Sequence, residues 1–250
     1  MNERFVELAP EGGGNLEWIK RALEHKVMQG EETAEGKHDT LLLLLGAADR
    51  YGFRLRIAQS HARHDLVTSD WSHVALLQEP QDDIASATVV EVSLAPRRGF
   101  GWPVETNGIQ RTPLLHYRSA RAFPNIALVR LPVSWEAVSQ QLDWLSRERR
   151  ALDLNGLVLA WLSFVWGVAG TSNPLLEGMG VPSAVMVETV VANAGYELTP
   201  GLDSGLSCPE AIWQTCRWWH PYYDQAGGKN APRGCWLRRH RTEAKLGLLA

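Results

Sequence analysis

The chain has 250 residues, of which 25 are basic and 28 acidic, and 45% of its residues are hydrophobic. A chain of this length buries enough apolar surface for a substantial core, so we expect one domain over residues 1–250. A net charge of −3 argues against a nucleic-acid-binding protein, because such proteins carry a marked excess of Lys and Arg.

The cysteines and the apolar segments exclude further classes of protein. Three cysteines, Cys208, Cys216 and Cys235, are an odd number without zinc-finger spacing, so we expect neither a disulfide framework nor a metal site. The first residues lack the basic-then-apolar order of a signal peptide, which predicts synthesis in the cytoplasm without one. The longest apolar segment, Leu157 to Gly170, is shorter than the roughly 18 residues of a membrane span, so it predicts a core helix and no integral membrane segment.

The first third of the chain offers structure but little chemistry. Residues 1–40 are polar and glycine-bearing, an N-terminal extension with one expected helix from Leu16 to Val27. Residues 53–57 alternate between apolar and basic, which predicts a half-exposed strand. The run His61-Ala62-Arg63-His64-Asp65, together with Asp70 and His73, contains nitrogen and oxygen metal ligands, but it lacks a helical period to fix their spacing. We therefore interpret it as a solvated loop and expect no metal and no cofactor.

The candidate chemistry begins at His73, which starts a short apolar run that ends at Leu77. The next β-like run, Thr88 to Leu94, carries one carboxylate in its middle, Glu91. If the two runs pair as antiparallel strands, side chains two residues apart share a face and these two residues meet across the ladder. We predict a hydrogen-bonded pair, roughly 2.6–3.2 Å or one water apart, in which His73 is a general base and Glu91 orients it.

The second half of the chain predicts further strands and helices around that pair. A loop rich in turn formers is followed by a strand, an amphipathic helix capped by Ser134, a second loop, and a buried helix that Gly195 ends. Another helix starts at Ser207-Cys208-Pro209-Glu210, and residues 221–250 are expected to be a basic, solvated C-terminal tail. The expected ranges are 96–113 for the first loop, 126–131 for the strand, 135–150 for the amphipathic helix with its terminal arginines, 171–182 for the second loop and 183–194 for the buried helix.

The order of these elements resembles the circularly permuted branch of the NlpC-like, papain-fold cysteine hydrolases. The residues that carry the resemblance are Ser72-His73-Val74-Ala75-Leu76 for the base strand and Val89-Val90-Glu91-Val92 for the orienter strand. The helix end Ala194-Gly195 and its Leu-Thr-Pro exit match the family's nucleophile helix, and counting back from them puts Ser183 at the cysteine position. The resemblance implies an α+β fold in which an antiparallel sheet packs on a buried, nucleophile-bearing helix.

The identity of the nucleophile stays open in the sequence. Ser183 is itself the nucleophile, or it replaces a cysteine through engineering or evolutionary loss, or the functional thiol is Cys208 at the next helix start. Helix N-termini stabilise thiolates, and a thiol needs less help from a base than a hydroxyl does, so chemistry favours Cys208. Register favours Ser183, and we expect Ser183 to face His73.

The resemblance implies a cysteine-type amidase or endopeptidase that acts on peptidoglycan peptides or another amide substrate. Some such enzymes are antibacterial toxins that a contact-dependent secretion system exports into a target cell envelope, which would add an immunity protein or a secretion-system carrier as partner. Two alternatives remain. One is a lipid acyltransferase or thioesterase of the same fold, and the other is a catalytically inactive binding module, which the missing cysteine at position 183 motivates.

Overall fold

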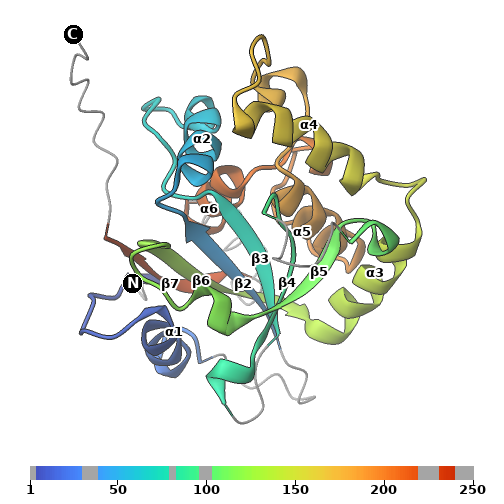
Figure 1. The fold of residues 1–250 in the computed structure, drawn as a ribbon. Helices are drawn as coiled ribbons and strands as arrows, with labels where there is room; N and C mark the ends of the chain where they lie inside the picture. Colours follow the sequence, from blue (N-terminus) through green and yellow to red (C-terminus); the bar gives the residue numbers. More distant parts are fainter. Residues whose placement is uncertain (1–3, 30–38, 79–82, 96–102, 219–230, 240–250) are drawn as a thin grey trace, which may run out of the picture.

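The computed structural model describes residues 4–29, 39–78, 83–95, 103–218 and 231–239. These residues form an α+β fold built on a mixed seven-stranded sheet with the order β1-β7-β6-β2-β3-β4-β5 (Figure 1). Neighbouring strands are antiparallel except for β1 and β7, which are parallel. The strands are β1 Phe5–Glu7, β2 Asp39–Gly46, β3 His73–Gln78, β4 Thr88–Val92, β5 Ile109–Pro113, β6 Asn125–Ser134 and β7 Arg233–Arg238.

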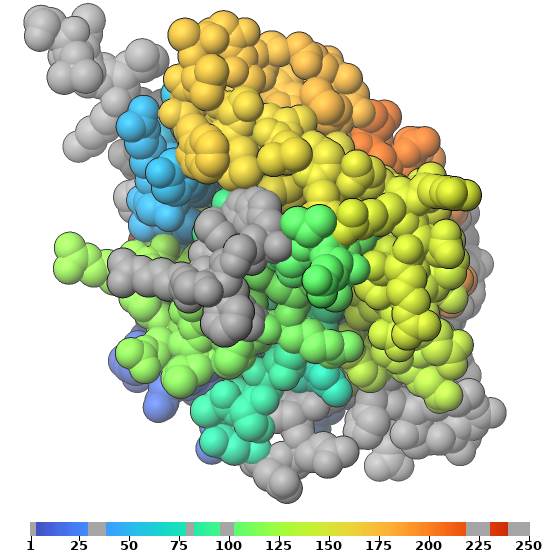
Figure 2. All heavy atoms as spheres, turned by 45° about the vertical axis from the view of Figure 1, so that its right-hand side comes forward, coloured from blue at the N-terminus to red at the C-terminus, as the bar shows by residue number. Residues whose placement is uncertain are grey.

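The helices lie on both faces of this sheet. Figure 1 shows α1 on one face, and α3, α4 and α5 on the other. The outer surfaces of α3 and α4 form the right-hand and upper parts of the molecule in Figure 2. The helices are α1 Asn15–Glu24, α2 Arg50–Ala58, α3 Trp135–Arg147, α4 Leu154–Trp166, α5 Pro182–Asn193 and α6 Pro209–Trp218, and a short 3₁₀ turn, η4 Leu114–Tyr117, follows β5.

Strand β2 shows why the sheet has two cores. Its five consecutive leucines are all fully buried, as expected of a central strand with both faces covered. Because side chains alternate along a strand, Leu42 and Leu44 join a large core with α3 to α6, whereas the other three leucines join a smaller core with α1 and η4. The two cores place two different chemical environments on opposite faces of one sheet.

Most of the expected helices are present. The helix expected from Leu16 is α1, the longest apolar segment forms most of α4, and Ser134 caps α3 by accepting the N–H of Ala137 at 3.3 Å. The buried helix is α5, and Gly195 follows it with a left-handed φ of 91°. No helix in the described ranges is long and apolar enough to cross a bilayer.

The strand expected at residues 53–57 is wrong, because this segment lies inside α2. Asp49 caps that helix by accepting the N–H of Gly52 at 2.7 Å. Arg56 is buried, and its Nε donates to the carbonyl oxygen of Ser69 at 2.6 Å. The strand prediction assumes that the apolar residues are buried and the basic residues are exposed. In α2 this does not hold, because Arg56 is buried and Phe53 and Ile57 are exposed.

The two ends of the chain are also more structured than the sequence suggests. The expected C-terminal tail contains β7, which lies between β1 and β6, and the expected N-terminal extension supplies β1 and α1. The loop expected over residues 96–113 ends in β5, which pairs with β4. In β7, four buried residues lie between two arginines. The basic residues of this region predict a solvated tail, although the segment between them is a short core strand. Residues 219–230 and 240–250 of the tail lie outside the described ranges.

Candidate active site

His73 and Glu91 meet on one face of the sheet, as predicted. Strand β3 pairs with β4 in a register that sets Leu76 opposite Val90, so Ala75 comes opposite Glu91 and His73 lies two residues along the same face. The Nε2 atom of His73 is 2.6 Å from Oε2 of Glu91. The predicted contact between these two side chains is confirmed.

Two hydroxyl groups hold the Glu91 carboxylate on its other sides. Thr112 Oγ1 donates to Oε1 and Tyr117 Oη donates to Oε2, each at 2.5 Å. Glu91 is only 1% exposed. Burial by itself would raise the pKa of Glu91, but the hydrogen bonds from His73, Thr112 and Tyr117, and the attraction of a His73 charge, outweigh it and lower that pKa. The carboxylate is therefore ionised and accepts hydrogen bonds only.

The ionised carboxylate sets the tautomer of His73. Because Glu91 is an acceptor, Nε2 of His73 carries the proton, and Nδ1 of the neutral ring keeps its lone pair. The His73 side chain is 16% exposed, and no described residue forms a hydrogen bond with Nδ1. The ring of Tyr117 stacks with the imidazole at a centroid distance of 6.5 Å. This arrangement leaves Nδ1 able to accept a proton from a ligand or a water.

Ser183 does not face His73, so the prediction that it does is wrong. Ser183 lies in the first turn of α5, whose buried side chains pack in the large core with Val74 and Val90. These two valines alternate along their strands with His73 and Glu91, so α5 covers the face opposite to the pair. Ser183 Oγ is buried, and within the described residues it has no hydrogen-bond partner. The register count from the helix end fixes a position along α5 but contains no information about which face α5 covers.

Cys208 is also on the wrong side of the sheet. It is 2% exposed at the start of α6, in the same core as α5. Burial raises the pKa of its thiol to about 12, although the backbone N–H groups of Ala211 and Glu210 partly oppose this rise. The thiol is therefore protonated at neutral pH and lies away from the pair. Burial likewise raises the pKa of Cys216 and Cys235.

The helix on the face of the pair is α1, which the sequence analysis left without a chemical role. Trp18 and Ile19 of α1 pack in the smaller core with Ala75 of the His73 strand. This helix precedes His73 in the chain, whereas the permuted order expects the facing helix to follow Glu91, so the structure does not support that order. The helix begins at Asn15, whose amide donates to the carbonyls of Tyr117 and Phe123, both at 3.0 Å.

Sequence reasoning missed Thr112 and Tyr117. Thr112 lies in β5, where Gln110 is opposite Glu91, so Thr112 projects on the face of Glu91 two residues further along. Pro113 and the preceding glycines predict turns, so the sequence pattern indicates the end of a loop at this segment. Recognising the edge strand would have indicated Thr112, but no local signal indicates Tyr117, which reaches Glu91 from the turn η4.

The run at residues 61–65 is held by ion pairs. Arg63 contacts Asp65 at 2.7 Å and the buried Glu210 at 3.0 Å, and Asp70 contacts Arg238 at 3.0 Å. The described ranges contain no cluster of three His, Cys, Asp or Glu side chains arranged to hold a metal. Arg63 instead joins this loop to α6.

Comparison of the chain with protein-family models, with curated proteins and with solved structures finds no match. The geometry around His73 and the resemblance in sequence pattern are therefore the grounds for a functional proposal.

Proposed function

We propose that this chain hydrolyses an acyl bond, amide or ester, with His73 as the general base and Glu91 as the group that orients it. The observation that carries the proposal is the 2.6 Å contact at Nε2 of a partly exposed histidine whose Nδ1 has no bonding partner among the described residues. A base needs an accessible lone pair and a fixed orientation, and this pair provides both. Of the resemblance to papain-fold hydrolases, only the patterns of the two strands that carry His73 and Glu91 agree with this geometry.

The positions of Ser183 and Cys208 make water the nucleophile in this proposal. Nδ1 of His73 takes a proton from a water, the water oxygen forms a bond to the carbonyl carbon, and the bond from that carbon to the leaving nitrogen or oxygen breaks. His73 then returns the proton to the leaving group. Thr112 and Tyr117 act as positioning residues, because they hold the carboxylate that stabilises the imidazolium.

Peptidoglycan peptides are the substrate that the resemblance favours, and an antibacterial effector with an immunity partner is the corresponding biological role. Acyl lipids are the alternative. Incubation of the purified chain with peptidoglycan and, separately, with phospholipid vesicles would distinguish them by mass spectrometry of the products. We expect His73→Ala to abolish turnover and the Ser183→Ala/Cys208→Ala double variant to retain it. Loss of turnover in the double variant alone would contradict a water nucleophile.

A binding module without catalysis is the second candidate, and the residue at the start of α1 favours it. Asn15 is fully buried at the helix N-terminus on the face of the pair, its amide is bonded to two carbonyls, and its Oδ1 accepts from Arg239 at 2.8 Å. A carboxamide is not a nucleophile. If neither substrate is turned over, while peptidoglycan fragments bind equally to the unmodified chain and to His73→Ala, this second candidate replaces the first.

A further inference from the structure

A long segment that contains η4 carries positive charge only. Residues 106–135 contain four arginines and one histidine but no Asp or Glu, although the whole chain has a net charge of −3. Of these basic residues, Arg111, His116, Arg118 and Arg121 are exposed. Basic side chains with no acidic neighbour along the chain make this segment a candidate for binding anionic ligands.

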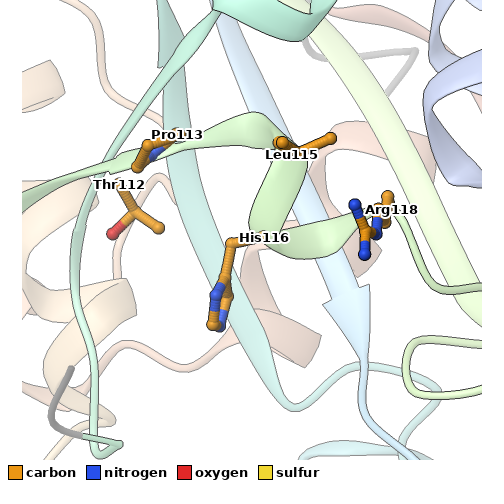
Figure 3. Close-up of a pocket in the computed structure, with 5 residues that line it drawn as sticks. All are labelled: Thr112, Pro113, Leu115, His116 and Arg118. Carbon is orange, nitrogen blue, oxygen red and sulfur yellow. The ribbon is translucent and has the colours of Figure 1, made fainter. Parts of the chain in front are cut away.

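An open surface pocket of about 450 Å³ lies within this segment. It is lined by Thr112, Pro113, Leu115, His116 and Arg118, and Figure 3 shows the His116 ring between Thr112 and Arg118. The Arg118 guanidinium has no ion pair or side-chain hydrogen bond to any residue in the described part of the chain. Two hydrogen-bonding side chains, His116 and Arg118, thus adjoin two apolar ones, and none of the described residues that line the pocket is acidic.

The pocket adjoins the His73–Glu91 pair through shared residues. Thr112, in the wall of the pocket, donates to Glu91 at 2.5 Å. Tyr117, between His116 and Arg118 in the chain, also donates to Glu91 and stacks on His73. A ligand that fills the pocket therefore lies next to the residues that hold the proposed base.

The backbone at Arg118 is held in place by the start of α1. Its carbonyl oxygen accepts the N–H of Asn15 at 3.0 Å. Gly14 lies so close that a Cβ atom there would be 2.6 Å from this oxygen, so only glycine permits the contact. This contact between α1 and the residue after η4 holds the Arg118 backbone, and with it the wall of the pocket, at a fixed place beside α1.

We propose that this pocket binds a carboxylate of the substrate, with Arg118 as its main contact, His116 as a second donor, and Pro113 and Leu115 against the adjoining carbon atoms. A guanidinium matches a carboxylate with two parallel hydrogen bonds, which favours this anion. The inference rests on the proposed hydrolysis and names its substrate class: acyl compounds, such as short peptides, that carry a free carboxylate close to the bond that is cut.

The test measures binding separately from turnover. Isothermal titration compares N-acetyl-alanyl-alanine, its C-terminal amide and inorganic phosphate, on the full chain and on two single variants. Arg118→Gln removes the proposed contact, whereas Arg111→Gln removes an exposed charge from the same segment outside the pocket. We expect the acid to bind at least tenfold more tightly than the amide, Arg118→Gln to abolish that preference, and Arg111→Gln to keep most of it.

Equal binding of the acid and the amide, or equal losses in the two variants, would overturn the carboxylate site. Binding of phosphate without binding of the dipeptide acid would overturn the choice of carboxylate. If the acid binds as expected to the unmodified chain and to His73→Ala, but no acyl substrate is cleaved, the pocket assignment is supported and the hydrolysis proposal fails. If hydrolysis occurs without any preference for a carboxylate, the hydrolysis proposal is supported and the pocket assignment fails.

Discussion

The pKa of a buried carboxyl group is shifted in opposite directions on the two faces of the sheet. On the face of α1, Glu91 is surrounded by a histidine and two hydroxyl groups, and its pKa is lowered. On the face of α5, Glu188 is bonded by the Thr199 N–H at 2.9 Å and by the Ser207 hydroxyl at 3.4 Å, and burial raises its pKa. Equal burial thus gives an ionised, paired carboxylate on one face and a destabilised charge on the other.

The same contrast separates the candidate base from the candidate nucleophiles. His73 has one ring nitrogen without a hydrogen-bond partner among the described residues and part of its surface exposed, whereas Ser183 and Cys208 are enclosed in the large apolar core. A side chain can take part in chemistry only if a reactant reaches it. Residue type and position at a helix start favour Ser183 and Cys208 as nucleophiles in the sequence. They do not indicate whether a substrate can reach these side chains in the folded chain.

The largest effect is expected in the large core. Val187 is fully buried in α5, so Val187→Asp loses about 1.5–3 kcal/mol of apolar burial and adds a carboxylate with no solvation, which should prevent folding. The matched control is Leu159→Asp, at a position 63% exposed on α4, which should leave the melting temperature nearly unchanged. A soluble Val187→Asp variant that melts cooperatively near the unmodified temperature would refute the position of α5 beneath the sheet.

A smaller but still large effect is expected for the pair. Glu91→Ala leaves His73, Thr112 and Tyr117 without their common acceptor, and each buried donor left unpaired costs about 1–3 kcal/mol. Urea unfolding at pH 7 would measure this loss. Gln110→Ala, which removes only a 3.4 Å contact to the same carboxylate, should cost far less.

The loss should also depend on pH. Because the pKa of Glu91 is lowered from its ordinary value of 4.5, its stabilising contribution is present above that pH and is lost as the pH falls. The difference in unfolding free energy between the unmodified chain and Glu91→Ala should therefore shrink in acid. A difference that is constant from neutral pH to pH 3 would mean that the carboxylate is not preferentially ionised in the folded chain.

Glu188 should show the opposite pH dependence. Its pKa is raised, so the folded state holds the proton more tightly than the unfolded state, and Glu188 destabilises the fold increasingly as the pH rises above 4.5. Glu188→Gln should therefore gain stability relative to the unmodified chain between acid and neutral pH, by about 1.4 kcal/mol for each unit by which the pKa of Glu188 is raised. If Glu188→Gln instead lost stability relative to the unmodified chain as the pH rises, as expected for Glu91→Ala, the two faces would not differ in how they stabilise a carboxylate.

The smallest effect is expected for a thiol placed at position 183. Ser183 is 2% exposed and away from His73, so Ser183→Cys should neither create hydrolysis nor react with iodoacetamide faster than the unmodified chain. Ser119→Cys, at an exposed position, is the positive control and should be alkylated rapidly. Rapid alkylation at position 183 in the folded protein, sensitive to His73→Ala, would show that residue 183 does face His73.

The sequence was sufficient for the strands β3 and β4, for the helices other than α2, and for the pair. Short apolar strands with one titratable residue each, and the period of α5, follow from local patterns, and the pairing of β3 with β4 then brings His73 to Glu91. The sequence does not predict which helix covers each face of the sheet. The alternation of side chains along a strand assigns each residue to a face, but it does not indicate which helix packs on that face. The helix on the same face as the pair, α1, is separated from His73 in the chain by β2 and α2, and β7 pairs with strands far away in the chain.

The central claim is that Glu91 fixes His73 as the Nε2–H tautomer with a free lone pair on Nδ1. Long-range ¹H–¹⁵N NMR of the ring nitrogens, recorded at a pH where the imidazole is neutral, tests it most directly, with Glu91→Gln as the comparison. We expect a protonated Nε2 and an unprotonated Nδ1 in the unmodified chain, and a weaker preference in Glu91→Gln. A protonated Nδ1, or a tautomer that Glu91→Gln leaves unchanged, would contradict the assignment of His73 as a base held by Glu91.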